Sequence, residues 1–225
     1  MSDFQAMSPY PTFIAGICRF VAQAIARVKV SGLEDLPREG PLIIAANHLS
    51  NADPPIIGGW LGPALGRRPT FLAKEALFHG PLGLLIRSLG AEPVKSGGND
   101  IGAYRVAKGI LDQGGVLAIL PEGTRSFDGV MADPKPGVSM LATRTGTPVL
   151  PVGISGTDDL MAREQTLPHI GARITMRVGR PFTLSIPAGV DRRAALEAAD
   201  EELMRRIAAL VEPRHRGKWE PWPDA

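Results

Sequence analysis

The sequence predicts an α/β fold with a mixed, mostly parallel sheet flanked by helices. Past residue 28, short apolar runs that are typical of buried strands alternate with segments whose apolar residues recur at helical spacing. Strands that alternate with helices favour βαβ units, in which the strands run parallel. Apolar residues make up 44% of the chain and charged residues 21%, a balance that excludes a largely disordered protein.

The N-terminal part is predicted as an amphipathic helix within Phe13–Val30. The polar residues Arg19, Gln23 and Arg27 recur every four residues and form one stripe. They interrupt the segment too often for a membrane span, which needs about 20 mostly apolar residues. Two interpretations remain open: a helix that lies in a membrane interface, or a surface helix that packs on its own domain. The residues before it lack the basic region of a secretory signal peptide.

Five apolar runs are predicted as buried strands, and two further segments as helices. The strands are Pro41–Ala46, Thr70–Ala73, Val116–Leu120, Pro148–Val152 and Arg173–Val178. One helix is predicted over Asp100–Gln113, because two glycines directly after it favour a helix end. The other is predicted over Asp191–Val211 and begins at an acidic capping residue.

The length of 225 residues suits one large domain. The predicted organisation is an amphipathic segment over 1–28, a main domain over 29–212, and a polar, proline-rich tail over 213–225 that forms a surface strap or a frayed end. The net charge of +2 argues against nucleic-acid binding, which needs a dense basic patch. A single cysteine, Cys18, excludes an intramolecular disulfide and a multi-cysteine zinc site, and the histidines show no metal-ligand spacing.

The sequence NHLSNADPP follows the first predicted strand directly and contains His48 and Asp53. Reactive groups collect at the carboxyl ends of strands in open α/β sheets. On one helix these two residues would lie about 140° apart, but across a strand-to-helix turn they can meet. As a pair they could act as a base and the residue that orients it. Each also has a structural interpretation, and Asp53 before Pro54 is typical of a helix N-cap.

A second polar turn, PEGTRS at residues 121–126, follows another apolar strand. If the two strands are parallel, this turn and the His48 turn open at the same edge of the sheet, which predicts a pocket between them. Taken alone, the composition of this turn also fits an ordinary glycine turn with a solvated arginine.

Together the two turns resemble the glycerolipid acyltransferase family, whose best-known members are the 1-acyl-glycerol-3-phosphate acyltransferases. The resemblance continues through a second motif, which includes FLAKE at 71–75 and GAEPV at 90–94, and through a fourth, PVLPVGI at 148–154. With the two turns as the first and third, four ordered motifs span roughly residues 28–180. It implies transfer of an acyl group from a thioester, acyl-CoA or acyl-carrier protein, to a glycerol hydroxyl. No cofactor and no metal ion is implied.

The resemblance also implies roles for individual residues. His48 would be the base that takes the proton of the acceptor hydroxyl, and Asp53 would fix its tautomer. The acceptor-binding residues would be Glu122, Gly123, Thr124, Arg125, Lys74 and Lys95. Arg125 is expected to hold the acceptor phosphate, because a guanidinium offers a bidentate fork. Glu122 could bind a glycerol hydroxyl or brace Arg125.

One position departs from the family pattern. Ser96 stands where the family commonly has an arginine that contacts the acceptor phosphate. Lys95 is adjacent, but neighbouring side chains on a strand face opposite ways, so it does not simply replace that arginine. The departure leaves open an acceptor with a different headgroup.

The sequence thus predicts an enzyme that acylates 1-acyl-glycerol-3-phosphate to phosphatidic acid in phospholipid biosynthesis. It is expected to be a peripheral protein at a membrane surface, on the cytoplasmic face. The alternatives are the same chemistry on another lyso-lipid or lipidated acceptor, and a lipid-binding protein without activity. A lipid-binding protein without activity would be expected to have another residue in place of His48 or Asp53, but both residues are present. A metal-dependent hydrolase would need a third ligand near this pair, and no motif supplies one.

Overall fold

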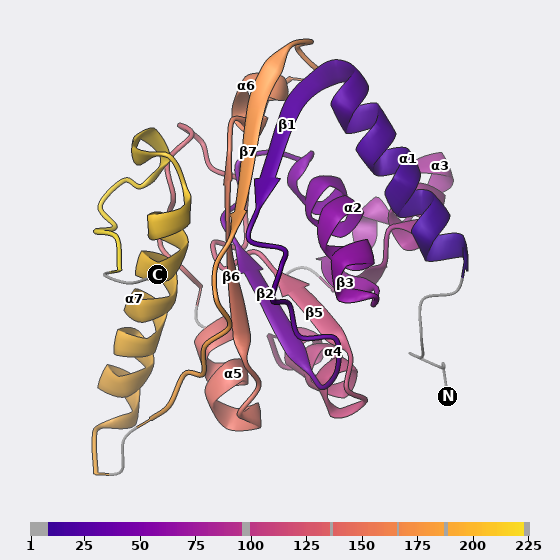
Figure 1. Ribbon diagram of the computed structural model, residues 1–225. Helices are drawn as coiled ribbons and strands as arrows, with labels where there is room; N and C mark the ends of the chain where they lie inside the picture. Colours follow the sequence, from indigo (N-terminus) through magenta and orange to yellow (C-terminus); the bar gives the residue numbers. More distant parts are fainter. Residues whose placement is uncertain (1–8, 96–99, 136, 166, 187–188, 223–225) are drawn as a thin grey trace.

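A seven-stranded sheet forms the centre of the part of the protein that this computed structural model describes, residues 9–95, 100–135, 137–165, 167–186 and 189–222 (Figure 1). The strands are β1 (Ala26–Ser31), β2 (Leu42–Ala46), β3 (Pro69–Lys74), β4 (Ala91–Val94), β5 (Val116–Ile119), β6 (Val149–Ser155) and β7 (Ala172–Val178). Their order in the sheet is β1-β7-β6-β2-β5-β3-β4. Paired strands are parallel except β6 and β7. The prediction of a mixed, mostly parallel sheet is confirmed.

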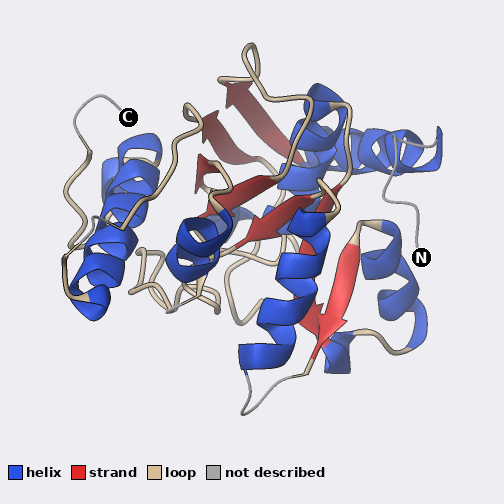
Figure 2. Ribbon diagram, turned by 90° about the horizontal axis from the view of Figure 1, so that it is seen from below, coloured by secondary structure: helices blue, strands red, loops and turns tan. Residues whose placement is uncertain are grey.

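Helices cover both faces of this sheet, which is the middle layer of the domain (Figure 2). The α-helices are α1 (Pro9–Ile25), α2 (Asp53–Leu65), α3 (Gly80–Ser88), α4 (Asp100–Asp112), α5 (Val138–Thr145), α6 (Thr157–Leu160) and α7 (Arg192–Leu210), with 3₁₀ turns η1 (Glu75–Leu77) and η2 (Pro213–His215). Side chains of α1 and α2 pack on one face, and those of α4, α5 and α7 pack on the other. Each face therefore has its own hydrophobic core.

The central strand β2 shows how the sequence produces this layering. Leu42 and Ile44 point into the core beneath α1 and α2, whereas Ile43 and Ala45 point into the core beneath α4, α5 and α7. A strand that is buried on both faces is a continuous apolar run instead of an alternating one. The run LIIAA satisfies this requirement and anchors the turn that follows it.

The predicted N-terminal helix is too long at its C-terminal end. Helix α1 ends at Ile25, and the next residues form the edge strand β1, which pairs in parallel with β7. The sequence ARVKVS alternates apolar and polar residues, and Val28 and Val30 pack against the core. This period of two is the pattern of a half-buried strand. The predicted boundary after Val28 therefore falls inside a strand.

The C-terminal residues pack back on the domain. Residues 213–215 form η2, in which His215 is buried. The backbone amide of Trp222 donates to the carbonyl of Arg205 in α7 at 3.0 Å. The described part of the tail is thus a strap along the surface.

Candidate active site

Three turns meet at the carboxyl ends of β2, β5 and β6. Strand β2 pairs in parallel with both of the others, so the turns after all three strands open at the same edge of the sheet. The first turn contains His48, the second covers 120–126, and the third leads into α6 at Thr157. The sequence predicted that the first two turns share an edge if their strands are parallel. The strands are parallel, and the turns share that edge.

His48 and Asp53 form a hydrogen-bonded pair in the first turn. The distance from His48 Nδ1 to Asp53 Oδ2 is 2.8 Å. The Asp53 side chain is completely buried, whereas 15% of the His48 side chain is exposed. Because an ionised carboxylate only accepts hydrogen bonds, Nδ1 carries the hydrogen, and in the neutral imidazole Nε2 therefore keeps its lone pair. An imidazole held in this way can take a proton from a substrate.

Asp53 does not cap α2 in the way that the sequence predicted. The helix begins at Asp53 itself, and Ala52 occupies the cap position. The carboxylate oxygen Oδ2 accepts hydrogen bonds from the amides of Leu49 and Ser50, both at 2.8 Å. These amides lie before Asp53 in the chain, so the carboxylate closes the preceding turn around itself.

The second carboxylate oxygen of Asp53 is held by Thr157, a residue that the sequence analysis did not identify. Thr157 Oγ1 donates to Asp53 Oδ1 at 2.6 Å, and both side chains are fully buried. Asp53 thus accepts from one imidazole, two amides and one hydroxyl. A carboxylate with this many donors has little freedom to rotate. A single threonine after a strand gives no indication of this role in the sequence.

Glu122 connects the second turn to the first. Its Oε1 accepts from the amide of His48 and its Oε2 from the amide of Ala132, each at 2.9 Å. The amide of Ser126 donates to the carbonyl of His48 at 2.8 Å. Burial raises the pKa of Glu122 to about 7, because desolvation of the carboxylate outweighs the two amide hydrogen bonds. In this structure Glu122 braces the backbone of His48 and not the side chain of Arg125.

Asn47 fixes the backbone directly before His48. Its Nδ2 donates to the carbonyl of Ile154 and its Oδ1 accepts from the amide of Ile154, both at 2.8 Å. The side-chain amide therefore extends the pairing between β2 and β6 by imitating a peptide group. Asparagine is typical of turns, so the sequence pattern did not indicate this role.

The predicted acceptor-binding cations lie along the same sheet edge. Lys74 ends β3 and Lys95 follows β4, and both side chains are exposed. Arg125 is half-buried in the second turn, where its Nη1 donates to the carbonyl of Arg163 at 2.9 Å. Of these three, only Arg125 lies in a turn that contacts His48 directly. Ser96 lies outside the described residues.

Gly123 and Thr124 shape the second turn. Gly123 has a φ of +65°, in the left-handed region that favours glycine. A Cβ at this position would also lie 2.7 Å from the side chain of Lys135. Thr124 Oγ1 accepts a hydrogen bond from Arg163 Nη1 at 3.3 Å. The structure thus assigns both residues a part in the shape of the turn, next to Arg125.

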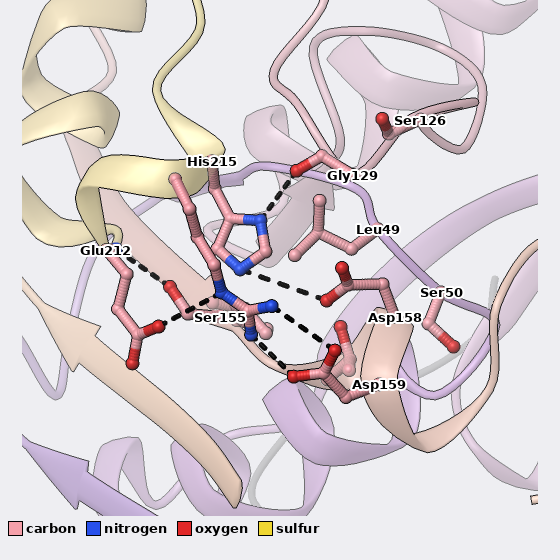
Figure 3. A network of polar contacts seen from close by, with 12 residues as sticks. Leu49, Ser50, Ser126, Gly129, Ser155, Asp158, Asp159, Glu212 and His215 are labelled. Atoms are coloured by element: carbon pink, nitrogen blue, oxygen red, sulfur yellow. Dashed lines mark hydrogen bonds and ion pairs between the residues drawn. The ribbon is translucent and has the colours of Figure 1, made fainter. Parts of the chain in front are cut away.

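Helix α6 is held in place by C-terminal residues (Figure 3). Arg214 donates to both carboxylate oxygens of Asp159 at 3.2 and 2.6 Å, and these hydrogen bonds lower the pKa of Asp159. The amide of Glu212 donates to Ser155 Oγ at 2.9 Å. Because Thr157 lies between Ser155 and Asp159, these contacts also fix the hydroxyl that reaches the dyad.

His215 joins the same helix to the loop after the second turn. Its Nδ1 donates to the carbonyl of Gly129 at 2.6 Å, and its Nε2 lies 3.8 Å from Asp158 Oδ1. Figure 3 shows the imidazole between these two groups. The tail therefore contacts α6 and the loop that follows the second turn.

Two other features bear on ligands. Within the described ranges, no group of three or more His, Cys, Asp and Glu side chains could hold a metal ion. A small apolar cavity lies between α1, α2 and α3, where Ile14, Gly59 and Leu89 are among its lining residues. None of the residues of the three turns lines this cavity.

Comparison with known proteins identifies the family. Residues 27–155, which contain the dyad and the second turn, match the model of the Acyltransferase family. The chain is 30% identical over 154 residues to a chloroplastic 1-acyl-sn-glycerol-3-phosphate acyltransferase of Brassica napus, and 29% identical over 142 residues to the alpha enzyme of that name from Homo sapiens. These alignments cover 66% and 62% of this chain, but only 43% and 49% of the relatives. The chain thus spans less than half the length of these two relatives.

A solved structure is similar over a larger share of both chains. The 1-acyl-sn-glycerophosphate acyltransferase PlsC from Thermotoga maritima superposes with a TM-score of 0.70 at 28% sequence identity. The superposition covers 89% of this chain and 79% of that one. On the match to the family model and on this likeness, the chain belongs to the Acyltransferase family.

Proposed function

We propose that this protein transfers a fatty acyl group from a thioester, acyl-CoA or acyl-carrier protein, to the hydroxyl of 1-acyl-glycerol-3-phosphate and so forms phosphatidic acid. The observation that carries the proposal is the 2.8 Å hydrogen bond between His48 Nδ1 and Asp53. It leaves Nε2 as a base at the sheet edge where the three turns meet. The names of the curated relatives and of PlsC support the same reaction.

In the proposed reaction the acceptor hydroxyl is the nucleophile. His48 Nε2 takes the hydroxyl proton as the oxygen attacks the thioester carbonyl, and Asp53 stabilises the imidazolium that forms. The tetrahedral intermediate then breaks its carbon–sulfur bond, and His48 returns the proton to the departing thiolate. The products are one ester and one thiol, so the reaction balances without a serine or cysteine nucleophile and without a cofactor.

The acceptor phosphate is proposed to lie near the basic residues of this edge. Arg125 is the first candidate, because its turn contacts the backbone of His48 through Ser126. Lys74 and Lys95 would add positive charge from the neighbouring strand ends, where both are exposed. A guanidinium can bind two phosphate oxygens at once, whereas an ammonium acts as a point charge.

A panel of acceptors tests the proposal. The purified protein would be incubated with radiolabelled acyl-CoA or acyl-carrier protein and with 1-acyl-glycerol-3-phosphate, other lyso-phospholipids, or 1-monoacylglycerol. We expect labelled phosphatidic acid as the main product. If another acceptor is labelled preferentially, the protein is an acyltransferase with a different substrate. If no acceptor is labelled, the proposal is contradicted.

We also propose that the protein works at a membrane surface, to which α1 attaches it peripherally. This helix buries small residues such as Ala15 and Ala22, while Phe13 and Phe20 are 66% and 74% exposed. Its packing on α2 is close, since a Cβ on Gly59 would lie 3.3 Å from the Cys18 Cβ. Large apolar side chains that face outward are typical of interfacial helices. No helix in the described ranges is long and apolar enough to cross a membrane.

Replacing both Phe13 and Phe20 by serine should weaken binding to anionic vesicles by at least about tenfold, because burying each ring in the interface contributes roughly 1.5–3 kcal/mol. Vesicle sedimentation measures this change. Leu167→Ser is the matched control, since Leu167 is 79% exposed but lies outside α1. Equal vesicle binding by the double variant and the control would refute the role of α1.

A further inference from the structure

Arg125 and Arg163 hold each other in place through reciprocal hydrogen bonds. Arg125 Nη1 donates to the carbonyl of Arg163 at 2.9 Å, and Arg163 Nη1 donates in return to the carbonyl of Arg125. Arg163 also donates to Thr124 Oγ1, and its guanidinium carbon lies 3.6 Å from the centre of the Phe127 ring. Three separate contacts therefore fix the direction of the Arg163 side chain.

The two guanidinium groups are not neutralised by the protein. Both side chains are half-buried, yet neither forms an ion pair with a carboxylate of the described residues. Glu122, the carboxylate of the same turn, already accepts from two backbone amides. Two unpaired cations on adjoining segments repel each other, and an anion between them would remove that repulsion.

Donors for such an anion remain on both side chains. A guanidinium has five N–H groups, and the hydrogen bonds of Arg125 and Arg163 within the described residues use only Nη1 of each. The Nε and Nη2 groups are therefore open to a ligand. Phe127 is 80% exposed, and its ring supports the Arg163 guanidinium through a cation–π contact.

The segments that carry the two arginines are both hydrogen-bonded to the turn that contains His48 and Asp53. Ser126, directly after Arg125, donates from its amide to the carbonyl of His48 at 2.8 Å. On the other side, Ser50 Oγ donates to the carbonyl of Met161, two residues before Arg163, at 2.8 Å. The segments that carry both cations are thus fixed to the turn that carries the dyad, as binding one short glycerol phosphate at this sheet edge requires.

We propose that Arg163 is a phosphate-binding residue that forms, with Arg125, a two-arginine subsite for the phosphate monoester of the acceptor. This inference rests on the proposed function. Arg163 lies beyond residues 27–155, the range that matches the family model. It supplies a guanidinium from the loop after α6, whereas Ser96 cannot supply one from the second motif.

The test compares Arg163→Gln with Arg105→Gln, a control that removes an exposed arginine on α4. With 1-acyl-glycerol-3-phosphate as the acceptor, Arg163→Gln should raise the acceptor KM about tenfold or more and leave the KM of the acyl donor unchanged. Turnover of 1-monoacylglycerol, which has no phosphate, should change little. Arg163→Lys should recover part of the loss, because a lysine keeps the charge but not the fork.

A binding arm separates failure of this inference from failure of the proposed function. Calorimetry with glycerol 3-phosphate should show binding to the wild type and to Arg105→Gln, and binding at least about tenfold weaker to Arg163→Gln. Equal binding by all three proteins, or no binding by any, overturns the subsite even if phosphatidic acid is formed. Equal losses on both acceptors would also overturn it, since they would indicate a purely structural role. Selective loss of glycerol 3-phosphate binding without any acyl transfer would support the subsite and contradict the proposed function.

Discussion

Thr157→Val removes the hydroxyl that holds the dyad carboxylate and keeps the shape of the side chain. In the wild type Thr157 Oγ1 lies 2.6 Å from Asp53 Oδ1, and both residues are fully buried. Within the described residues this hydroxyl is the only donor to Oδ1, since the other three donors bind Oδ2. The variant therefore leaves one buried, charged oxygen without a partner.

The size of the effect follows from that lost hydrogen bond. A hydrogen bond to a charged group contributes about 1.5–3 kcal/mol, so we expect the free energy of unfolding to fall by about that amount. A carboxylate that is less fixed orients His48 less well. We expect kcat to fall about tenfold, which corresponds to about 1.4 kcal/mol in the barrier. The KM values should change little, because Thr157 contacts neither substrate in the proposed mechanism.

Denaturant unfolding and steady-state acyl transfer, measured on the same preparations, test this prediction. Thr157→Ser keeps the hydroxyl and should recover most of kcat. Thr147→Val is the control: Thr147 is buried and accepts a hydrogen bond from Thr145 at 2.7 Å, but it lies before β6, at the opposite end from the dyad. The control should lose stability without losing kcat. The reasoning is refuted if Thr157→Val retains the wild-type kcat, or loses no more of it than Thr147→Val.

Two further predictions concern stability. The pKa of Glu122 is raised from 4.5 to about 7, so the stability it contributes is full below about pH 4.5 and is lost as pH rises through about 7. Glu122→Gln should remove this loss of about 3 kcal/mol, seen as a smaller difference between the unfolding free energies at about pH 4 and about pH 8. An unchanged difference would mean that the pKa is not raised. Gly153→Ala places a Cβ 2.5 Å from Leu210 Cβ in α7 and should cost about 1–3 kcal/mol in thermal unfolding experiments. The control Gly16→Ala meets no atom within 4 Å and should not destabilise the protein.

The central strands could be predicted from the sequence because burial on both faces requires an uninterrupted apolar run, as in LIIAA and VLPVGIS. The acidic cap of α7 could also be predicted, because a helix cap depends only on neighbouring residues: Asp191 accepts hydrogen bonds from the amides of Arg193 and Ala194. The edge strands were missed for physical reasons. Strand β1 directly continues α1, while β4 has four residues and contains a proline. Neither is the uninterrupted apolar run that identified the central strands.

The candidate site divides in the same way. His48 and Asp53 are five residues apart, so a single strand-to-helix turn brings them together and the sequence could indicate the pair. The contacts that fix this pair join residues 74 and 104 positions apart, Glu122 to His48 and Thr157 to Asp53. Only the order of strands in the sheet places those residues next to each other. The spacing of residues along the chain therefore could not predict these contacts.

The central claim is that His48 Nε2 accepts the proton of the acceptor hydroxyl. The most direct test is the kcat for acyl transfer to 1-acyl-glycerol-3-phosphate by His48→Ala, with thermal unfolding measured on the same sample. The side chain of His48 is partly exposed and hydrogen-bonds Asp53 only through Nδ1, so the variant should remain folded. The account predicts that kcat falls roughly 10²–10⁴-fold, the usual cost of losing a general base. A folded His48→Ala protein that turns over at near the wild-type rate would contradict it.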